Sequence, residues 1–290
     1  MNLVESLEKA TAYLERHNIR SPRLNSELLL CHTLRLERIE LYTAFDRELS
    51  EAEAGAYRSL LVRRGTGRPL QYITCEAGFR GLTLEVREGV FIPRPETEVL
   101  VEKAIEVIGV GGARVLDLGT GCGNIAVSIA AECPRTLLTA TDVDPAAVAL
   151  CRRNAMRHGV VERVRVLEGD LFEALRELQG AIFDVVVSNP PYIPERSRET
   201  LEAEVRDFEP HGALFAGEDG LAVTERLIAA APGCLRPGGW LVLEADESAA
   251  EEVAGGLRGD AWEDVECFRD LAGRPRVVRA RLGERRAGGR

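Results

Sequence analysis

The sequence predicts an α/β fold with a doubly wound parallel sheet, preceded by a small helical domain and a β-hairpin. Beyond Pro95, short apolar segments alternate with longer amphipathic ones, which is the pattern of strands and helices in a parallel sheet. A glycine-rich turn follows the first of these strands, as in α/β folds that bind nucleotides. The last two strand candidates have no helix between them, so the last strand should run antiparallel to its neighbours.

The helical domain is expected over residues 1–74. Apolar residues recur at helical intervals from residue 2 to about residue 64. Ser21-Pro22 marks one helix start, and Ser50 with Glu53 resembles a capping box at another. These signals predict four or five helices.

Residues 75–95 are predicted to form a β-hairpin that links two domains. A breaker-rich stretch precedes this segment, in which apolar residues alternate with polar ones around Gly81 and Gly89. Residues 96–283 are then expected to form the larger domain. Residues 284–290 are polar and rich in Gly and Arg, which predicts a flexible tail.

Within the larger domain, short apolar segments give the expected strands. They are 114–118, 136–142, 163–168, 183–188, 239–244, 263–268 and 275–282. The expected helices lie near 96–108, 124–132, 145–158, 219–235 and 247–258. Only a short polar turn joins the last two strands, so they should pair as a hairpin at the end of the sheet.

The composition is that of a globular protein with an ordinary core. Of the 290 residues, 45% are apolar, which is enough for one large domain and a smaller one. The first ten residues carry two glutamates and no basic run, which argues against a signal or transit peptide. No uncharged apolar stretch approaches the ~18 residues of a membrane span. We therefore expect a cytoplasmic location and no membrane partner.

Cysteine spacing and charge exclude several kinds of site. The seven cysteines are scattered and never spaced C-x-x-C, so neither a disulfide framework nor a metal site is predicted. The net charge of −10 lies outside residues 1–80, which hold 12 basic and 11 acidic side chains against 25 and 36 in the rest. An acidic larger domain is unsuited to tight, sequence-independent binding of nucleic acid, so no direct nucleic-acid partner is expected.

The strand expected at 114–118 runs into a turn whose glycines are spaced G-x-G-x-G. Such a turn lets the backbone approach a ligand at the edge of the sheet where nucleotides bind. A dinucleotide fingerprint would need glycine where Asn124 stands, and the G-K-[ST] of a phosphate-binding loop does not follow. An adenosyl cofactor without phosphates therefore fits better than NAD or ATP. The residues expected to border it are Gly119, Thr120, Gly121, Cys122 and Gly123.

Carboxylates at the ends of the next two strands are further candidates for cofactor contacts. Asp142 lies about 20 residues after the glycines, where nucleotide folds place an acceptor for ribose hydroxyls. Asp144 is expected instead to cap the following helix. Asp170 either reaches the adenine amino group, with Leu171 or Phe172 covering the ring, or caps a helix of its own.

The segment Asn189-Pro190-Pro191-Tyr192 ends the strand expected at 183–188 and carries the strongest chemical signal. Proline fixes its own φ, restricts the residue before it and supplies no donor, so this turn is stiff and rich in acceptors. A group with two N–H bonds, such as a carboxamide or the exocyclic amine of a base, is its natural complement. The alternative is an ordinary strand-to-loop turn, since Asn-Pro and Pro-Pro are common in loops.

Together these motifs resemble the class I S-adenosylmethionine-dependent methyltransferases, whose fold is Rossmann-like. Asn189-Pro190-Pro191-Tyr192 narrows the resemblance to enzymes that methylate amino groups. The segment Phe91-Ile92-Pro93-Arg94-Pro95-Glu96-Thr97-Glu98, set between a hairpin and the glycine turn, is similar to that of the PrmC/HemK family. The resemblance runs from about residue 5 to residue 280. It implies S-adenosyl-L-methionine as cofactor and a peptide chain release factor as protein substrate.

In this family the methyl group goes to the amide N5 of the glutamine in a Gly-Gly-Gln loop. The resemblance implies that the Asn189 side-chain oxygen and the Pro190 carbonyl each accept one N–H, with Pro191 in the same turn. It also implies that Asn189 borders the cofactor and that Tyr192 packs on the flat amide, although core packing with a surface hydroxyl would explain Tyr192 too. The amide nitrogen shares its lone pair with the carbonyl, so alignment of the amide is the expected contribution of the site, and no dedicated base is assigned.

The chain departs from the family pattern at two places. Leu171 stands where many members carry an aromatic residue, and Glu244-Ala245-Asp246 stands where Glu-Ile-Gly is common. No catalytic role is assigned to Glu244. Arg94, Glu96 and Thr97 either border the cofactor or form an interdomain turn with a helix start.

Three other functions stay open at this point. A DNA or RNA amino-group N-methyltransferase would use the same turn on a base amine, but it should carry a basic stripe or a recognition module. A non-catalytic cofactor-binding module would not need both the glycine turn and Asn189-Pro190-Pro191-Tyr192. An NAD-dependent oxidoreductase is disfavoured by the glycine spacing.

Overall fold

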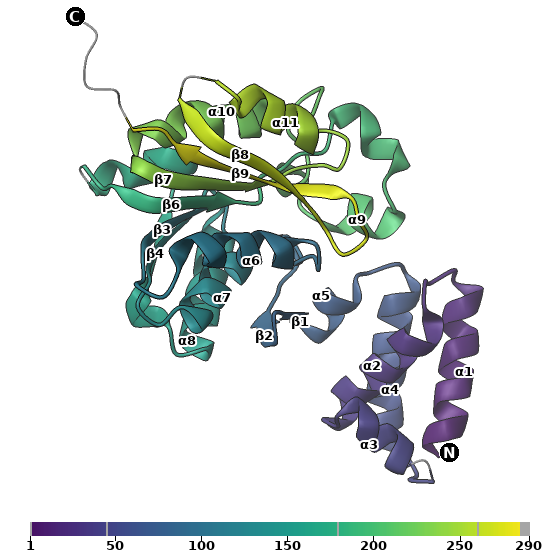
Figure 1. Cartoon of the computed structure of the whole chain (residues 1–290). Helices are drawn as coiled ribbons and strands as arrows, with labels where there is room; N and C mark the ends of the chain where they lie inside the picture. The colour runs from purple at the N-terminus through teal and green to yellow at the C-terminus, as the bar shows by residue number, and fades with distance from the viewer. Residues whose placement is uncertain (1, 45, 179, 260, 285–290) are drawn as a thin grey trace, which may run out of the picture. The chain divides into compact units, whose positions relative to one another are not determined.

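The computed structural model describes residues 2–44, 46–178, 180–259 and 261–284 (Figure 1). Most of the tail expected at 284–290 lies outside these residues. The chain forms two compact units. The helical unit comprises Met1–Glu76 with Leu201–Phe208, and the sheet unit comprises Ala77–Thr200 with Glu209–Arg290.

The helical unit is built around a leucine-rich core. Its helices are α1 (Leu3–Arg16), α2 (Pro22–Leu34), α3 (Arg38–Thr43), α4 (Glu51–Gly65), α5 (Leu70–Thr74) and α9 (Ala203–Phe208). The predicted capping box starts α4, because the side chains of Ser50 and Glu53 each accept from the other's backbone N–H. The expected start of α2 is also confirmed, although Ser21 is left-handed and its side chain makes no capping hydrogen bond.

Helix α9 joins the helical unit although it lies far along the chain. The guanidinium of Arg64 on α4 is buried and donates to Glu204 Oε2 at 2.7 Å, Asn25 Oδ1 at 2.7 Å and the carbonyl of Arg68 at 2.8 Å. Arg20 forms an ion pair with Glu202 next to α9. These contacts hold Leu201–Phe208 among helices that precede it by more than a hundred residues.

The sheet unit contains the hairpin and the large sheet. Its strands are β1 (Glu76–Phe79), β2 (Leu82–Glu85), β3 (Arg114–Leu118), β4 (Leu137–Asp142), β5 (Val164–Glu168), β6 (Phe183–Ser188), β7 (Leu235–Glu244), β8 (Trp262–Arg269) and β9 (Pro275–Leu282). Its α-helices are α6 (Thr97–Ile108), α7 (Asn124–Glu132), α8 (Pro145–Arg157), α10 (Ala222–Ala230) and α11 (Ala250–Leu257). The short 3-10 segments include Leu171–Glu177.

The sheet order is β5-β4-β3-β6-β7-β9-β8. The first five strands are parallel, and β9 is antiparallel to both β7 and β8. The predicted antiparallel last strand is therefore confirmed, but it lies inside the sheet and β8 forms the edge. Strand β7 begins at Leu235, four residues before the predicted 239, because Leu235 pairs with Phe183 ahead of a register shift.

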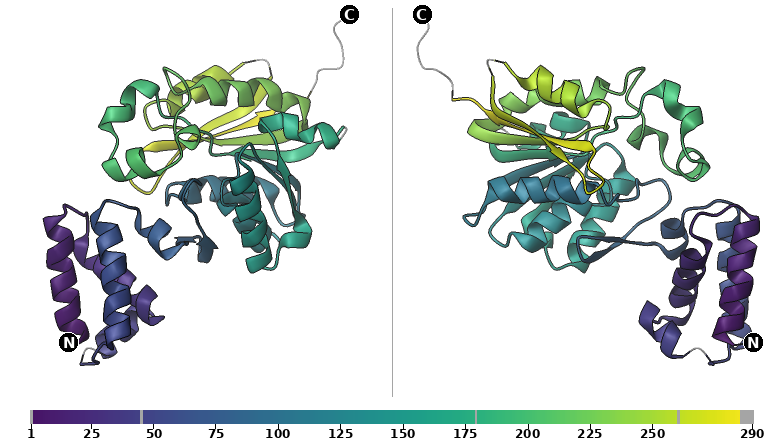
Figure 2. Two further views of the ribbon diagram at one scale, coloured as in Figure 1. Left: turned by 180° about the vertical axis from the view of Figure 1, so that it is seen from behind. Right: turned by 45° about the vertical axis from the view of Figure 1, so that its right-hand side comes forward.

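Both faces of the sheet are covered by helices (Figures 1 and 2). Successive strand residues point to opposite sides, so Val115 and Val185 pack with α6, α7 and α8, whereas Leu116 and Val186 pack with α10 and α11. Burial on both faces explains why these strands read as continuous apolar runs. The doubly wound α/β fold is confirmed.

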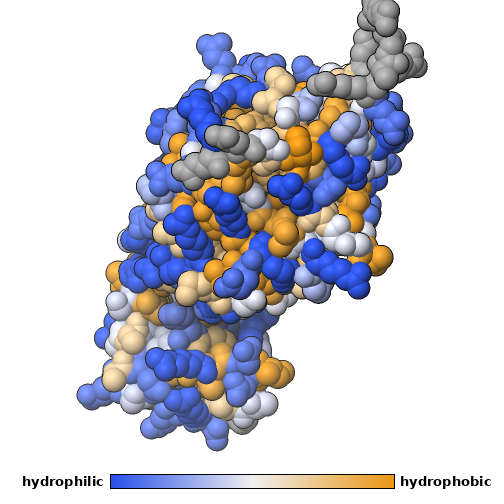
Figure 3. Space-filling view, turned by 90° about the vertical axis from the view of Figure 1, so that its left-hand side faces the viewer, coloured by the Kyte–Doolittle hydropathy of each residue, from blue (hydrophilic) through white to orange (hydrophobic). Residues whose placement is uncertain are grey.

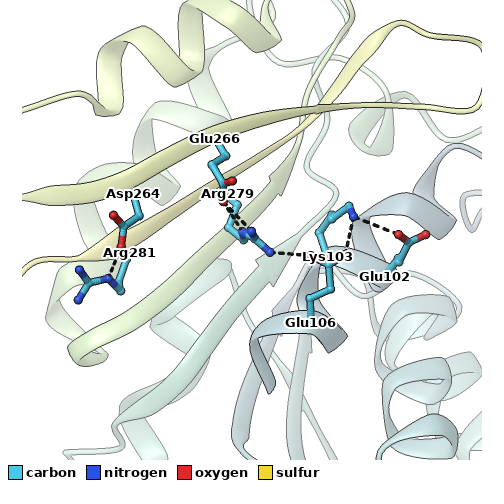
Figure 4. A network of polar contacts seen from close by, with 7 residues as sticks. All are labelled: Glu102, Lys103, Glu106, Asp264, Glu266, Arg279 and Arg281. Atoms are coloured by element: carbon cyan, nitrogen blue, oxygen red, sulfur yellow. Dashed lines mark hydrogen bonds and ion pairs between the residues drawn. The ribbon is translucent and has the colours of Figure 1, made fainter. Parts of the chain in front are cut away.

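A network of ion pairs fastens α6 to the antiparallel end of the sheet (Figure 4). Arg279 on β9 pairs with Glu266 on β8 at 2.6 Å and with Glu106 on α6 at 2.9 Å. Its guanidinium also lies over the rings of Trp240 and Phe268, at 5.2 and 4.7 Å from their centroids. These contacts tie α6, β8 and β9 together.

The hairpin β1–β2 is attached to α8 by one buried side chain. Asn154 accepts from the backbone N–H of Glu85 at 2.7 Å and donates to the carbonyls of Glu85 and Cys122, at 2.9 and 2.8 Å.

On the face shown in Figure 3, hydrophilic residues are interspersed with scattered hydrophobic ones, as on ordinary protein surfaces. Among the described residues, no helix is long and apolar enough to cross a membrane.

Candidate active site

The predicted site residues follow strands that end in register. Leu118 of β3 pairs with Thr141 of β4 and with Ser188 of β6, and Ser188 pairs with Leu243 of β7. The glycine turn, Asp142, Asn189 and Glu244 each come directly after one of these residues. They therefore share the carboxyl edge of the sheet, at the point between β3 and β6 where the strand order reverses and α/β folds bind ligands.

The glycine turn offers open backbone at two positions. Gly119 and Thr120 donate their backbone N–H groups to the carbonyl of Thr141, both at 2.9 Å. Gly119 and Gly121 have φ of +71° and +56°, and a Cβ built on either would meet nothing within 4 Å. This space on the ligand side is what close approach of a cofactor requires.

The other residues of the turn face inward. Thr120 and Cys122 are each 1% exposed, so their side chains belong to the interior. A Cβ on Gly123 would lie 2.7 Å from Cys151 Sγ, which makes this glycine a contact between α7 and α8. The structure thus separates the five predicted residues into two that are open to a ligand and three that support the turn.

Asp117 is a site residue that the sequence analysis missed. It lies on β3 beneath the glycine turn, is fully buried and accepts from Thr120 Oγ1 at 2.6 Å. Burial raises the pKa of its carboxyl to about 7, and the neighbouring Asp142 contributes to the rise. An acidic residue inside the apolar strand Val-Leu-Asp-Leu was the signal that could have found it.

Asp142 lies at the edge of the glycine turn and holds it in place. Its carboxylate accepts the backbone N–H of Gly121 at 2.8 Å and that of Asp144 at 3.0 Å. Burial raises its pKa, although these two hydrogen bonds oppose the rise. Asp144 accepts from the N–H of Ala146 at 2.8 Å, so the expected cap of α8 is confirmed.

Asp170 and Leu171 begin the 3-10 segment after β5. The Asp170 side chain makes no capping hydrogen bond and instead forms an ion pair with Arg226 at 2.5 Å. Leu171 has φ of +47°, a left-handed conformation that is uncommon for a bulky residue. Such backbone is often found at functional sites. Leu171 follows β5, which lies two strands from β3, the strand that precedes the glycine turn.

The turn Asn189-Pro190-Pro191-Tyr192 is anchored at both ends. Ser188 Oγ, immediately before it, donates to the carbonyl of Leu118 at 2.6 Å. Asn189 Nδ2 donates to Thr97 Oγ1 at 3.1 Å, and the Tyr192 hydroxyl donates to Glu244 Oε1 at 3.3 Å. The hydroxyl therefore points to a buried carboxyl group, which overturns the alternative of a hydroxyl at the surface.

The segment after this turn is fixed by close backbone contacts. Ile193 accepts from Ala216 N–H at 3.1 Å and donates to the carbonyl of Leu214 at 2.9 Å. Gly220 packs so tightly behind the turn that a Cβ there would lie 2.3 Å from the carbonyl oxygen of Tyr192. The acceptor-rich turn is thus a rigid part of the sheet unit.

The segment 91–98 supports the same site. Thr97 is the first residue of α6, as a helix start requires, and it also contacts Asn189. Arg94 forms an ion pair with the buried Glu209 and lies over the ring of Phe91, 4.9 Å from its centroid. Thr97 therefore belongs to the site, whereas Arg94 is engaged in fixing the segment.

Comparison with known structures identifies the fold. The chain is similar to a methyltransferase from Pyrococcus furiosus, with 20% identity, a TM-score of 0.51 and coverage of 71% of this chain and 91% of the other. It is also similar to the hMettl16 catalytic domain in complex with the MAT2A 3′UTR hairpin 6, with 16% identity, a TM-score of 0.57 and coverage of 77% and 81%. The fold is that of the Rossmann-like class I methyltransferases.

Sequence comparison identifies the family. Residues 5–74 match the PrmC N-terminal domain and residues 88–208 match the methyltransferase small domain. Proteins named release factor glutamine methyltransferase are 42% identical in Geobacter sulfurreducens, over 96% of this chain and 95% of theirs, and 42% identical in Deinococcus radiodurans, over 100% of both. The chain belongs to the release factor glutamine methyltransferase family, as the resemblance predicted.

S-adenosyl-L-methionine is accordingly the cofactor of this enzyme. The residues present fit it, because Gly119 and Gly121 leave room for close backbone approach and Asp142 offers carboxylate oxygens beside them. Each oxygen of Asp142 accepts one backbone N–H and keeps a second lone pair as an acceptor. The expected adenosyl cofactor without phosphates is therefore confirmed as a class.

Proposed function

We propose that the enzyme methylates N5 of the glutamine in the Gly-Gly-Gln loop of a release factor, and that Asn189 and Pro190 hold the amide during transfer. The observation that carries this proposal is the hydrogen bond from Asn189 Nδ2 to Thr97 Oγ1. With its NH₂ group occupied in this way, the Asn189 side chain has its oxygen available as an acceptor in a turn whose prolines supply no donor.

The mechanism rests on alignment of a weak nucleophile. One N–H of the glutamine amide is donated to Asn189 Oδ1 and the other to the Pro190 carbonyl, which turns the face of the nitrogen towards the methyl group. S-adenosyl-L-methionine, held beside Gly119, Gly121 and Asp142, would supply the methyl group from its sulfonium sulfur, which would keep the electron pair of the broken C–S bond. The methylated nitrogen would lose its extra proton to solvent. Near-attack alignment can lower the barrier by up to ~7–11 kcal/mol in model systems. Tyr192 and Pro191 form a wall against the flat amide.

Other site residues are proposed to hold the cofactor. Gly119 and Gly121 would approach it with their backbone, and Asp142 would accept from the ribose hydroxyls. Asp170 would accept from the adenine amino group, for which it must share or exchange its ion pair with Arg226. Leu171 would cover the adenine ring in place of an aromatic residue.

We further propose that the enzyme acts in the cytoplasm on a protein substrate, without binding nucleic acid or membranes directly. The acidic balance of the sequence outside residues 1–80 supports this view, because it would repel phosphate backbones. Retention of duplex DNA at micromolar protein and physiological salt would contradict it.

The decisive experiment uses methyl-labelled S-adenosyl-L-methionine with a release factor and with the same factor carrying alanine for the Gly-Gly-Gln glutamine. Label on the unmodified factor alone supports the proposal. Equal label on both would place the methyl group elsewhere and would overturn it.

The role of Asn189 is tested separately with Asn189→Ala. We expect kcat to fall by roughly 100-fold or more, the effect of deleting one well-placed polar group from an active site. Binding of S-adenosyl-L-methionine, measured by calorimetry, should change little. Unchanged turnover would exclude Asn189 as the acceptor.

A further inference from the structure

The turn that joins β8 to β9, the yellow strands in Figure 1, lies at the same edge of the sheet as the candidate active site. Because β9 is antiparallel to both of its neighbours, β8 runs parallel to β6 and β7 and ends at the carboxyl edge. One row of paired residues crosses the sheet from β6 to β8 through Ser188, Leu243, Val278 and Cys267. Asn189 comes one residue after this row, and the β8–β9 turn, residues 270–274, begins three residues after it.

The turn is near enough to Asn189 to meet the same substrate. Neighbouring strands are ~4.8 Å apart, so β9 and β8 lie roughly 10 and 14 Å to the side of β6. Leu271 follows Cys267 by four residues, which places it up to roughly 13 Å beyond the row. An extended peptide spans ~3.3–3.6 Å per residue, so about five residues reach from Asn189 to Leu271.

A buried carboxylate fixes the backbone of the turn. Asp270 is 7% exposed, and its Oδ1 accepts the backbone N–H groups of Ala272 and Arg274, at 2.9 and 3.0 Å. The N–H of Asp270 donates to the carbonyl of Arg274 at 2.8 Å, and its carbonyl accepts from Gly273 N–H at 2.9 Å. These four hydrogen bonds enclose Leu271 and hold the tip of the turn in one conformation.

Two arginines attach the turn to the loop that follows β7. Arg276 Nη1 donates to the carbonyl of Ala245 at 3.4 Å, and Ala245 N–H donates to the carbonyl of Arg276 at 2.9 Å. Arg274 forms an ion pair with Glu247 at 3.2 Å. Since Ala245 comes directly after β7, the turn is fastened to the carboxyl edge on which the site is built.

This rigid tip presents a fully exposed apolar side chain. Leu271 is 99% exposed, the highest value among the large apolar residues that the structure describes. A single exposed leucine needs no explanation by itself. Leu271 differs because it stands at the active-site edge on backbone that is already fixed, so little conformational freedom is lost when a partner packs on it.

The position of the cofactor leaves this side of the sheet to the protein substrate. The glycine turn and Asp142 follow β3 and β4, on one side of β6, and the β8–β9 turn lies on the other side. The attacking nitrogen has to lie opposite the leaving sulfur, so a glutamine held at Asn189 comes from the side away from the glycine turn. The residues that flank it then pass over the ends of β7, β9 and β8.

We propose that the tip of the β8–β9 turn is a docking point for the release factor, where Leu271 packs on an apolar side chain about five residues from the methylated glutamine. The inference rests on the proposed methylation of that glutamine and adds a second point of contact on the sheet unit. Leu271 touches neither the glutamine nor the cofactor, so it acts on substrate binding and not on the chemical step.

The test is steady-state methylation of the whole release factor by Leu271→Asp. A carboxylate would be desolvated against an apolar partner, so we expect the KM for the release factor to rise about tenfold or more. The kcat at saturating release factor and the Kd of S-adenosyl-L-methionine should both stay within about twofold. Leu271→Met keeps an apolar side chain of similar volume and should hold KM within about threefold.

Val110→Asp is the matched control. Val110 is 94% exposed and lies between α6 and the start of β3, at the opposite edge of the same sheet. The substitution adds the same charge to the sheet unit, and KM should equal that of wild type. Both aspartate variants should keep the wild-type melting temperature, since neither side chain is packed in the free enzyme. An unchanged KM in Leu271→Asp, or an equal rise in Val110→Asp, would overturn the docking role.

Two further results separate the alternatives. If Leu271→Asp keeps KM but sedimentation shows that it abolishes self-association of the wild type, the tip contacts a second copy of this chain and the proposal is refuted. If wild type labels the release factor only at its Gly-Gly-Gln glutamine while Leu271→Asp has a normal KM, the docking role alone is wrong. Equal label on the factor that carries alanine for this glutamine would instead refute the proposed function.

Discussion

Two carboxyl groups that the strands carry into the interior, Asp117 and Glu244, make the stability of this enzyme depend on pH. Burial is the main cause in both, and it raises each pKa to about 7 in the folded protein, from ordinary values of 3.8 and 4.5. At a pH between the ordinary pKa and the raised pKa, each group is protonated in the folded protein and ionised in the unfolded chain. Stability is therefore highest below about pH 4 for these groups and falls as the pH rises towards 7.

Asp117→Asn should accordingly flatten the pH dependence of the free energy of unfolding. Each pKa unit removed corresponds to about 1.4 kcal/mol between the two ends of the window. Urea unfolding at pH 5, 6, 7 and 8 measures the slope, which should be shallower in the variant. Glu244→Gln removes the other buried carboxyl group and should also make the slope shallower. A slope unchanged in both variants would show that neither group takes up a proton on folding.

Asp142 and Asp144 lie two residues apart and give contrasting expectations for cofactor binding. Asp142→Asn replaces an acceptor of two backbone N–H groups and of the proposed ribose hydroxyls by a group with one acceptor atom. We expect the Kd of S-adenosyl-L-methionine to rise about tenfold or more, as for the loss of a charge-assisted hydrogen bond. Asp144→Asn keeps the helix cap and should bind the cofactor normally, and calorimetry on both variants decides the matter.

At the scale of the elements, the turn after β6 depends on a glycine that approaches it from another segment. Gly220 has φ of +84°, and an added Cβ would overlap the carbonyl of Tyr192. Gly220→Ala should therefore lower both the melting temperature and kcat. Gly273→Ala is the control, since its φ is +80° but its Cβ would meet nothing within 4 Å. Gly273→Ala introduces backbone strain without a clash. An equal loss of melting temperature and kcat in both variants would exclude the clash with Tyr192 as the cause.

Strands and helices of the sheet unit were predictable because their burial is local in the sequence. Apolar runs that are buried on both faces predicted β3 to β6 to within one residue. The antiparallel end of the sheet was predicted because no helix separates the last two strands. The start of β7 was missed because Pro237-Gly238-Gly239 reads as a turn, although β7 pairs with β6 on both sides of it, at Leu235 and at Trp240. Helix α9 could not be assigned to the helical unit, since contacts with residues far back in the sequence, such as Arg64 and Arg20, place it there.

The candidate site divides in the same way. The glycine turn, Asp142 and Asn189 could be found because each follows an apolar strand in a recognisable motif. Thr97 and Glu244 could not, because nothing in either segment shows that they meet Asn189 and Tyr192. Hydrogen bonds between distant segments depend on the register of the sheet, which a single sequence does not state.

At the scale of the whole molecule, Arg64 carries the attachment of α9 to the helical unit. Arg64→Ala would leave Asn25 Oδ1 and the Arg68 carbonyl without this donor and would remove the partner of Glu204. The cost should be about 1–3 kcal/mol of stability, because buried acceptors lose their donor while Glu204, whose side chain is 34% exposed, can be hydrated. Amide hydrogen exchange should show early loss of protection in α9, while the central strands of the sheet keep theirs.

Glu204→Gln is the control for this prediction, because an amide oxygen can still accept from the guanidinium. Its effect should be well below that of Arg64→Ala, since Asn25 and the Arg68 carbonyl keep their donor. Equal exchange of α9 in wild type and Arg64→Ala would show that other contacts hold the helix.

Because Leu201–Phe208 belongs to the helical unit, the polypeptide passes between the two units three times, near residues 76, 200 and 208. The helical unit is thus composed of two separate segments of sequence, so exchange of the N-terminal segment alone does not exchange the whole unit. In a chimera that takes residues 1–76 from a relative, the relative's helices would have to pack against α9 of this chain. Exchange of the whole helical unit between two enzymes would require both pieces to move together, and a hybrid that folds after exchange of the first piece alone would show that the α9 contacts are interchangeable among relatives.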